Sequence, residues 1–366
     1  MNESKSFRVI QRGVYQEIHI QLIPLHGETP EIFSERIAGI VQDCNAEIIR
    51  ATFFGKLNEE ENFVRHLLSK LNGIDFPYSW IEGDNCTGSF INGVYIFAIS
   101  GIEVKRLYEH ARVIGSFFQT RDADFCYLGG LYSKPDQSPS QQTSVLLNSA
   151  ESLLNRVGLS FQNTVRTWFY LDDILNWYKD FNLARTSFFQ LHKIYNKLVP
   201  ASTGIGGKNN HASKVCLELI AIKPKTDYFS IAKVRSPLQC PAEDYGSSFS
   251  RAVSYSDNEY ATLTVSGTAS INPEGKTMHP DEIQKQIELS FKVVTAILDS
   301  QNFKFSDIIR FYAYCSDKRY SKEFFNYVES CFPYQFAIIC SENKVCRNGL
   351  LFEIELDAVR NLLKEN

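Results

Sequence analysis

A glutamate near the C-terminus is the residue best placed by its sequence to donate a proton. Glu353 lies in LLFEIEL, an apolar run whose alternation predicts a β-strand, and Glu353 and Glu355 then share one face of that strand. A carboxyl group in apolar surroundings has a raised pKa, which suits it to proton donation near neutral pH. The alternative is a strand-end carboxylate held by an arginine at an interface.

A repeat within the chain distinguishes Glu353 from Glu355. An earlier strand, KVCLELIAI, aligns with LLFEIELDAV so that Glu218 matches Glu355 and Cys216 matches Glu353. An acid that occurs in both copies is most simply structural. Glu353 occurs in one copy only, so it is an acid that the fold itself does not require.

Two other segments could line a ligand site. PASTGIGG, residues 200–207, combines two hydroxyl side chains with three glycines, which let backbone N–H groups approach a ligand; a plain glycine-rich turn is the alternative. Cys346, in VCRNG, is either a pocket thiol or a small buried apolar residue. No His/Asn partner is apparent in the sequence, which argues against a papain-like nucleophile.

Each of the three repeats has an arginine at the equivalent position: Arg50, Arg166 and Arg310. An ion pair at each repeat interface is the simplest explanation for a residue that is present in every copy. The alternative is that one of them clamps a carboxylate of a ligand in a bidentate manner.

The elements that position these residues form copies of one unit. Residues 141–174 predict an amphipathic helix, a helix end at Gly158 and a β-rich strand. The same pattern returns 144 residues later with Asn302 in place of Gly158, and the N-terminal third holds a fainter copy. We therefore expect an α/β (α+β) fold of tandem β-α-β-α-β units. The expected divisions are a first unit over 1–102, a helical linker over 103–124, a second unit over 125–227 and a third over 228–366, in which 228–256 is an irregular connection over a cleft.

Composition excludes several classes of function. The formal net charge is -4 and no basic run occurs, so nucleic acid is not an expected partner. There is no signal peptide and no apolar stretch of about 18 residues, which predicts a cytoplasmic protein without membrane contact. The nine cysteines form no CxxC pair and the seven histidines are scattered, so we expect free thiols and no metal. The absence of GxGxxG and Walker patterns argues against a nucleotide, and we expect no cofactor.

The segments taken together resemble one family. RTWFYLDDI, WYKDFNLARTSFF, PASTGIGG, VSGTASI, HPDEIQKQIE and VCRNGLLFEIE follow one another, over roughly residues 90–360, in the order found in chorismatases. The resemblance implies a Rid/YjgF-like (chorismate-mutase-like) fold, with the three units arranged as an intramolecular pseudo-trimer. A monomer is then expected, with higher association left open.

The resemblance also implies a reaction. Chorismatases cleave the enolpyruvyl ether of chorismate to pyruvate and a ring product, and the position of their acid maps to Glu353. Cys346, seven residues earlier, resembles the branch that releases a hydroxybenzoate rather than a dihydroxycyclohexadiene carboxylate. Contacts to the substrate are expected from Arg166, Arg185, Thr203, Gly204, Cys346, Arg347 and Thr268, with Ser266 a weaker candidate.

Two other functions remain in competition with chorismate cleavage. A Rid-type enamine or imine deaminase would need an arginine after Pro-Ala, but Pro200 and Ala201 are followed by Ser202. A non-catalytic protein that binds small aromatic acids between its repeats is the other alternative. Glu353, an acid present in one repeat only, favours the enzyme.

Overall fold

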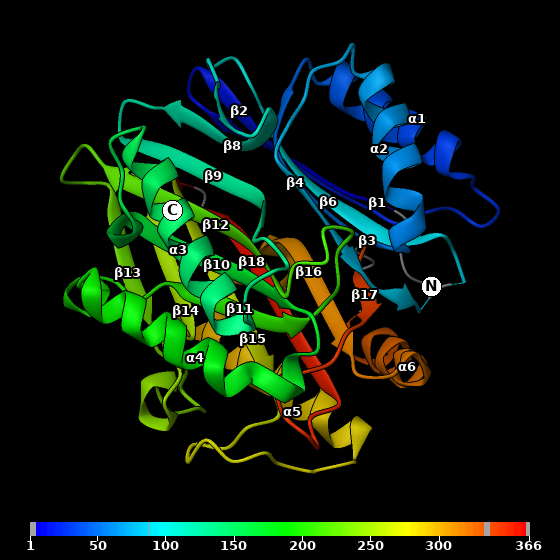
Figure 1. Ribbon diagram of the computed structural model, residues 1–366, viewed down its shortest axis with the longest axis vertical. Coiled ribbons are helices and arrows are strands. Elements are labelled where there is room, and N and C mark those ends of the chain that lie inside the picture. Colours follow the sequence, from blue (N-terminus) through cyan, green and yellow to red (C-terminus); the bar gives the residue numbers. More distant parts are fainter. Residues whose placement is uncertain (1–4, 87, 333–336, 364–366) are drawn as a thin grey trace.

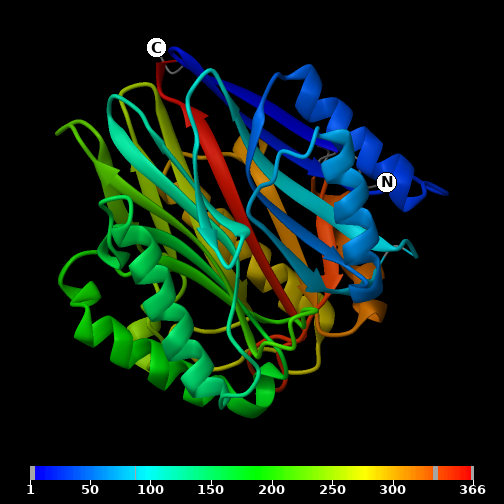
Figure 2. The ribbon, with the colours of Figure 1, turned by 45° about the horizontal axis from the view of Figure 1, so that its top comes forward.

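Strands gather in the middle of the molecule and helices lie on its outside (Figures 1 and 2). The structure is a computed structural model that describes residues 5–86, 88–332 and 337–363. Three sheets, each covered by one pair of helices, make up the architecture.

The first unit is a five-stranded sheet of order β1-β2-β6-β3-β4. Its elements are β1 (Lys5–Arg12), β2 (Tyr15–Leu22), α1 (Pro30–Asp43), β3 (Glu47–Gly55), α2 (Glu60–Lys70), β4 (Tyr78–Glu82) and β6 (Ile91–Ser100). The short strand β5 (Asp84–Asn85) leaves this sheet and pairs with the third one.

The second and third units repeat this strand order with one more edge strand each. The second consists of β7 (Lys105–Glu109), β8 (Arg112–Gln119), β9 (Ala123–Tyr132), α3 (Pro139–Asn155), β10 (Thr164–Leu171), α4 (Ile174–Leu191), β11 (Ala201–Gly206) and β12 (Val215–Pro224). The third consists of β13 (Ser230–Val234), β14 (Ala252–Ser256), β15 (Tyr260–Ala269), α5 (Ile283–Ser300), β16 (Ile308–Cys315), α6 (Ser321–Cys331), β17 (Ile339–Glu342) and β18 (Phe352–Asn361). The predicted tandem units with a pseudo-threefold arrangement are therefore confirmed.

The helix ends show the repeat in detail. The residues that follow α1, α3 and α5 at equivalent places are Asn45, Gly158 and Asn302, and each has a positive φ, of 46°, 73° and 57°. Glycine and asparagine adopt this left-handed conformation most readily, which explains why those two residue types recur there.

The expected helical linker over 103–124 is wrong. The segment forms the hairpin of β7 and β8, which belongs to the sheet of the second unit. His110 and Ala111 both have positive φ, of 48° and 65°, as the two central residues of a tight hairpin turn do. The segment expected to be irregular, 228–256, likewise begins and ends in strands β13 and β14, and residues 235–251 between them are largely without regular structure.

Four large apolar clusters fill most of the interior of the described part of the chain. Each unit has one between its sheet and its helices, and a fourth lies in the centre, where the three sheets face one another. Phe54, Tyr170 and Tyr312, one from each unit, meet in this central cluster, and the ring centroids of Tyr170 and Tyr312 lie 5.9 Å and 5.1 Å from that of Phe54. Each sheet is thus buried on both faces, one against its helices and the other against the other two sheets.

The three arginines that recur in the repeats meet in the centre of the molecule, around Trp168. The guanidinium groups of Arg50, Arg166 and Arg310 lie 4.1, 4.4 and 4.9 Å from the ring centroid of Trp168. Arg50 donates to Glu218 at 2.7 Å across the interface of units one and two. Arg166 and Arg310 both donate to Glu355, and Arg310 also to Asp357. Every one of the three is therefore neutralised by a buried carboxylate.

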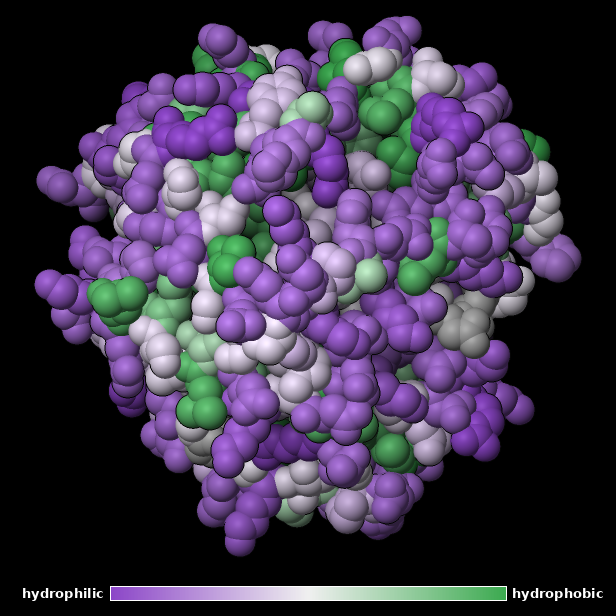
Figure 3. Space-filling model, viewed as in Figure 1, coloured by the Kyte–Doolittle hydropathy of each residue, from purple (hydrophilic) through white to green (hydrophobic). Residues whose placement is uncertain are grey.

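The outer surface is predominantly polar. Figure 3 shows one face as mostly hydrophilic, with hydrophobic side chains in small scattered patches. Among the described helices, none combines the length and the apolar character that crossing a membrane requires.

Glu218→Gln tests whether these ion pairs hold the units together. The free energy of unfolding should fall by about 3–5 kcal/mol, because Arg50 would remain buried without its counter-charge. Urea unfolding followed by circular dichroism measures this loss. Glu61→Gln, which removes the exposed partner of Arg65, is the matched control and should cost no more than about 1 kcal/mol. Similar small losses in both variants would contradict the prediction.

Candidate functional site

A pocket lies between the second and third units, where the first residues of β18 face β11 and α4. Both units and the connection 235–251 contribute to its wall. The lining residues are Tyr178, Arg185, Ser202, Gly204, Ser247, Phe249, Arg251, Gly267, Ala269, Ile271, Cys346, Arg347 and Glu353.

Glu353 enters the pocket from a central strand. It lies opposite Ala269 on β15 and Tyr314 on β16, and 5% of its surface is exposed. A Cβ atom at Gly267 would lie 2.0 Å from Glu353 Oε1. Glycine at position 267 is therefore what leaves room for this carboxyl group.

The surroundings keep Glu353 protonated over most of the neutral range. Burial, followed by the charge of Glu355, raises its pKa from 4.5 to about 8, against the opposing influence of Arg166, Arg251 and Arg347. A carboxyl with such a pKa carries its proton at pH 7 and can donate it.

Glu355, on the same strand face, has the opposite character. Burial would raise its pKa, but Arg310 and Arg166 outweigh burial and hold the pKa below its usual value. It accepts further hydrogen bonds from Trp168 Nε1 and Tyr314 Oη at 3.0 Å and from Thr203 Oγ1. Glu355 is therefore an ionised structural group.

The pseudo-symmetry shows what stands at the position of Glu353 in the other units. Strand register places Phe54, Tyr170 and Tyr314 opposite Gly93, Cys216 and Glu353 respectively. Both other positions are closely packed. A Cβ atom at Gly93 would lie 2.7 Å from the carbonyl oxygen of Leu22, and Cys216 is fully buried with its Sγ 3.7 Å from Ser79 Oγ.

Three arginines surround Glu353. Arg185 of α4 donates to Asn182 Oδ1 at 2.7 Å and lies 4.9 Å from the ring centroid of Phe181. Arg251 donates to the carbonyl oxygen of Cys240 at 2.9 Å, and Arg347 to that of Gly275 at 2.6 Å. These contacts hold the three guanidinium groups at the pocket, which becomes strongly cationic.

The thiol of Cys346 is a neutral group in this wall. Burial, followed by the charge of Glu353, raises its pKa to about 12. The nucleophilic form of cysteine is the thiolate, so this residue is present in its unreactive form at neutral pH.

The structure brings together some of the predicted site residues and separates others. Glu353, Arg185, Gly204, Cys346 and Arg347 line the pocket. The remaining three predicted contacts, Arg166, Thr203 and Thr268, are not among the lining residues.

The side chains of these three residues form hydrogen bonds with other protein groups outside the pocket. The Arg166 guanidinium and the Thr203 hydroxyl are bound to each other at 2.8 Å and to Glu355, and Thr268 Oγ1 donates to the Ser266 carbonyl oxygen at 2.8 Å. Thr203 Oγ1 also accepts from the backbone N–H of Gly267 at 2.9 Å, which connects Glu355 to the glycine beside Glu353.

Sequence reasoning missed Arg251, Tyr178 and Phe249. Tyr178 lies on α4, where its ring packs against Phe181 with centroids 5.8 Å apart. Arg251 and Phe249 come at the end of the irregular connection, which was expected to cover a cleft. No feature of the sequence distinguishes them from other residues of that connection.

The raised pKa of Glu353 predicts a stability that depends on pH. The folded protein holds this proton more tightly than the unfolded chain, so the stabilisation is full below about pH 4.5. It is lost as the pH rises toward about 8, by ~1.4 kcal/mol for each pH unit. Glu353→Gln should remove this dependence. Urea unfolding of both proteins at about pH 5, 6.5 and 8 measures the difference, and a difference that stays constant over this range would contradict the prediction.

Comparisons with known proteins give one family match, within the third unit, and several similar structures. The family model of endoribonuclease L-PSP matches residues 246–360, which fall in the third unit. No curated protein sequence matches the chain. A crystal structure of yeast Mmf1 is 24% identical over 36% of this chain and 99% of its own, with a TM-score of 0.30.

A crystal structure of a chorismatase is similar over almost the whole chain. It covers 96% of this chain and 100% of its own, with a TM-score of 0.66 and 15% sequence identity. The expected resemblance is confirmed at the level of the fold: this chain folds as that chorismatase does.

Proposed function

We propose that this protein cleaves the enolpyruvyl ether of chorismate, with Glu353 as the proton donor. The observation that carries the proposal is a buried, protonated carboxyl group among three arginines, in a chain with the fold of a chorismatase. General acids work best when their pKa lies near the working pH, and about 8 meets that condition.

The charge of the pocket suits this substrate. Chorismate carries two carboxylates, and Arg185, Arg251 and Arg347 supply three positive charges around one carboxyl that is itself neutral. Arginine is well suited to binding carboxylates because its planar guanidinium can donate two parallel hydrogen bonds. Tyr178 and Phe249 add flat apolar surface for the ring.

The reaction follows from these groups. Glu353 transfers its proton to the methylene carbon of the enolpyruvyl group, which leaves an oxocarbenium ion and a carboxylate. The arginines and the new carboxylate stabilise the charges in a pocket with little water. Water adds to the cation, or a ring group attacks it, and the ether C–O bond breaks to give pyruvate. The carboxylate then takes back a proton.

In this proposal Arg166, Thr203 and Thr268, which do not line the pocket, position other groups. Arg166 and Thr203 hold Glu355 ionised, and that negative charge helps to keep the proton on Glu353. Thr268 fixes the β15 backbone next to Gly267. We assign substrate contact instead to Arg185, Arg251 and Arg347, with Gly204 beside Tyr178.

Substrate entry requires movement at the pocket. The pocket has a volume of only about 30 Å³, whereas ligand sites commonly measure about 300–1,000 Å³. Arg347 lies on the connection between β17 and β18 and is partly exposed, so its displacement opens the pocket most directly. We also propose that the chain acts as a monomer, since its three units occupy the positions of a trimer.

Incubation of the purified protein with chorismate tests the proposal. Pyruvate should form, and Glu353→Gln should lower kcat by about 10²–10⁴-fold while the protein stays folded. Glu61→Gln, the same change at an exposed site, should keep full activity. For the wild type, kcat/KM should fall as the pH rises through about 8 because the ionised carboxyl cannot donate a proton.

Each competing function has its own outcome in the same experiments. Ammonia release from freshly generated iminopyruvate, without pyruvate from chorismate, would show an imine deaminase. Saturable binding of hydroxybenzoate without turnover of chorismate would show a binding protein. Either result, or full activity of Glu353→Gln, would overturn the assignment.

The ring product gives a separate prediction. We propose a hydroxybenzoate, on the resemblance of Cys346 to the branch that aromatises the ring. Cys346→Ala should then keep pyruvate formation and shift the ring product toward the dihydroxycyclohexadiene carboxylate. Chromatography of both products, with the wild type as reference, measures the ratio. An unchanged ratio would remove Cys346 from the control of product identity.

A further inference from the structure

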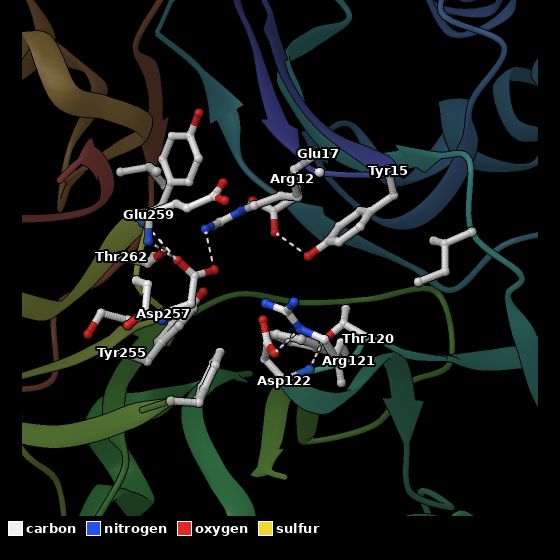
Figure 4. Close-up of a pocket in the computed structure, with 18 of the residues that line it drawn as sticks. Arg12, Tyr15, Glu17, Thr120, Arg121, Asp122, Tyr255, Asp257, Glu259 and Thr262 are labelled. Atoms are coloured by element: carbon white, nitrogen blue, oxygen red, sulfur yellow. Dashed lines mark hydrogen bonds and ion pairs between the residues drawn. The ribbon is translucent and has the colours of Figure 1, made fainter. Parts of the chain in front are cut away.

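A second, larger cavity of about 630 Å³ lies at the other end of the central strands. Val359 on β18 belongs to its lining, and Glu353 is six residues earlier on the same strand, which places the two sites about 20 Å apart. Three equivalent hairpin turns surround the cavity, one from each unit: β1 to β2, β8 to β9, and β14 to β15. Figure 4 shows side chains from these turns facing one another across the space.

The inner wall of this axial cavity is aromatic. Phe97, Phe125, Tyr127 and Phe229 line it and are each less than a tenth exposed, and Tyr255 stacks on Phe229 with centroids 6.5 Å apart. Rings from all three units therefore surround one space of the size that small-molecule sites have. An aromatic wall binds flat apolar groups, and the faces of the rings also attract cations.

Acidic side chains outnumber basic ones in the lining of the cavity. Arg12 lies between two carboxylates, 3.0 Å from Glu17 Oε2 and 3.1 Å from Asp257 Oδ2. Glu17 is buried, which would raise its pKa, but Arg12 and His19 lower the pKa to about 2, so the group is ionised. One guanidinium thus faces two negative charges. At the rim Arg121 pairs with Asp122 at 2.9 Å, and Glu259 adds another carboxylate.

A buried polar atom without a hydrogen-bond partner in the described part of the chain completes the site. The imidazole of His19 is 7% exposed, and its Nδ1 is 2.8 Å from Tyr95 Oη. Its Nε2 lies 3.9 Å from Glu17 Oε2 and has no hydrogen-bond partner among the described residues. His19 lowers the pKa of Glu17, so its Nε2 acts toward that carboxylate as an N–H rather than as an acceptor, and at 3.9 Å this N–H is not fully satisfied. A buried polar atom of this kind normally finds a partner.

We propose that the axial cavity binds a small organic cation, specifically a protonated amine that carries an aromatic ring. The ammonium group is placed next to Glu17 and Asp257, where it balances the excess negative charge. The ring then lies among the aromatic side chains of the wall. An anion such as chorismate or hydroxybenzoate is disfavoured there by the same charges, so this site is separate from the pocket of Glu353.

Calorimetric titration with 2-phenylethylammonium tests the proposal, with 3-phenylpropionate as the matched anion. We expect saturable binding of one ammonium per chain, at least ten times tighter than binding of the anion. Glu17→Gln and Asp257→Asn should each weaken binding of the cation tenfold or more. Asp257 is half-buried near the rim, so its variant tests the site even if Glu17→Gln is poorly folded.

A variant of the other pocket keeps the two proposals distinguishable. Glu353→Gln should bind 2-phenylethylammonium as the wild type does, whether or not the protein cleaves chorismate. Absence of binding at millimolar concentration, equal affinity for the anion, or unchanged affinity in both carboxylate variants would each overturn the axial site. Loss of cation binding in Glu353→Gln would show that the cation binds in the pocket of Glu353, and would also overturn the axial site.

Discussion

The buried arginines around Trp168 and the carboxylates that neutralise them determine how the three units fit together. A guanidinium group inside a protein is costly unless a carboxylate meets it with good geometry. Arg50 obtains Glu218 from the second unit, and Arg166 obtains Glu355 from the third. These contacts fix the relative position of adjacent sheets, because sliding one strand along another would leave two buried charges without partners.

The same constraint produces the chemistry of the candidate site. Side chains two residues apart on a strand share a face, so fixing Glu355 against the arginines directs Glu353 toward the adjacent pocket. Arg166 and Arg310 stabilise the ionised form of Glu355. Its negative charge, together with burial, keeps the proton on Glu353. One strand thus carries two neighbouring carboxyl groups with opposite protonation, each determined by its surroundings rather than by its residue type.

Divergence among the units decides where a ligand can bind. The positions equivalent to Glu353 are occupied by Gly93, which packs against Leu22 of its own unit and Ile339 of the third, and by Cys216, which packs against Ser79 of the first unit. Gly267 leaves that space open in the third unit. At the other end of the strands the three hairpin turns differ in sequence, and they enclose an aromatic cavity with excess negative charge. The pseudo-symmetric frame therefore holds two cavities whose lining charges are opposite in sign.

The sequence by itself determined the repeated units, their helix ends at Gly158 and Asn302, and the distinction of Glu353 from Glu355, because these depend on local conformation and on comparison of copies. Only the tertiary structure decided which predicted contacts reach the pocket. Arg166 and Thr203 turn toward Glu355, whereas Arg251 arrives from an irregular segment. The hairpin of β7 and β8 was also missed, since its turn lacks glycine. For Arg166 and Thr203 the deciding partner, Glu355, lies far away in the chain, and burial of charge selects their orientation.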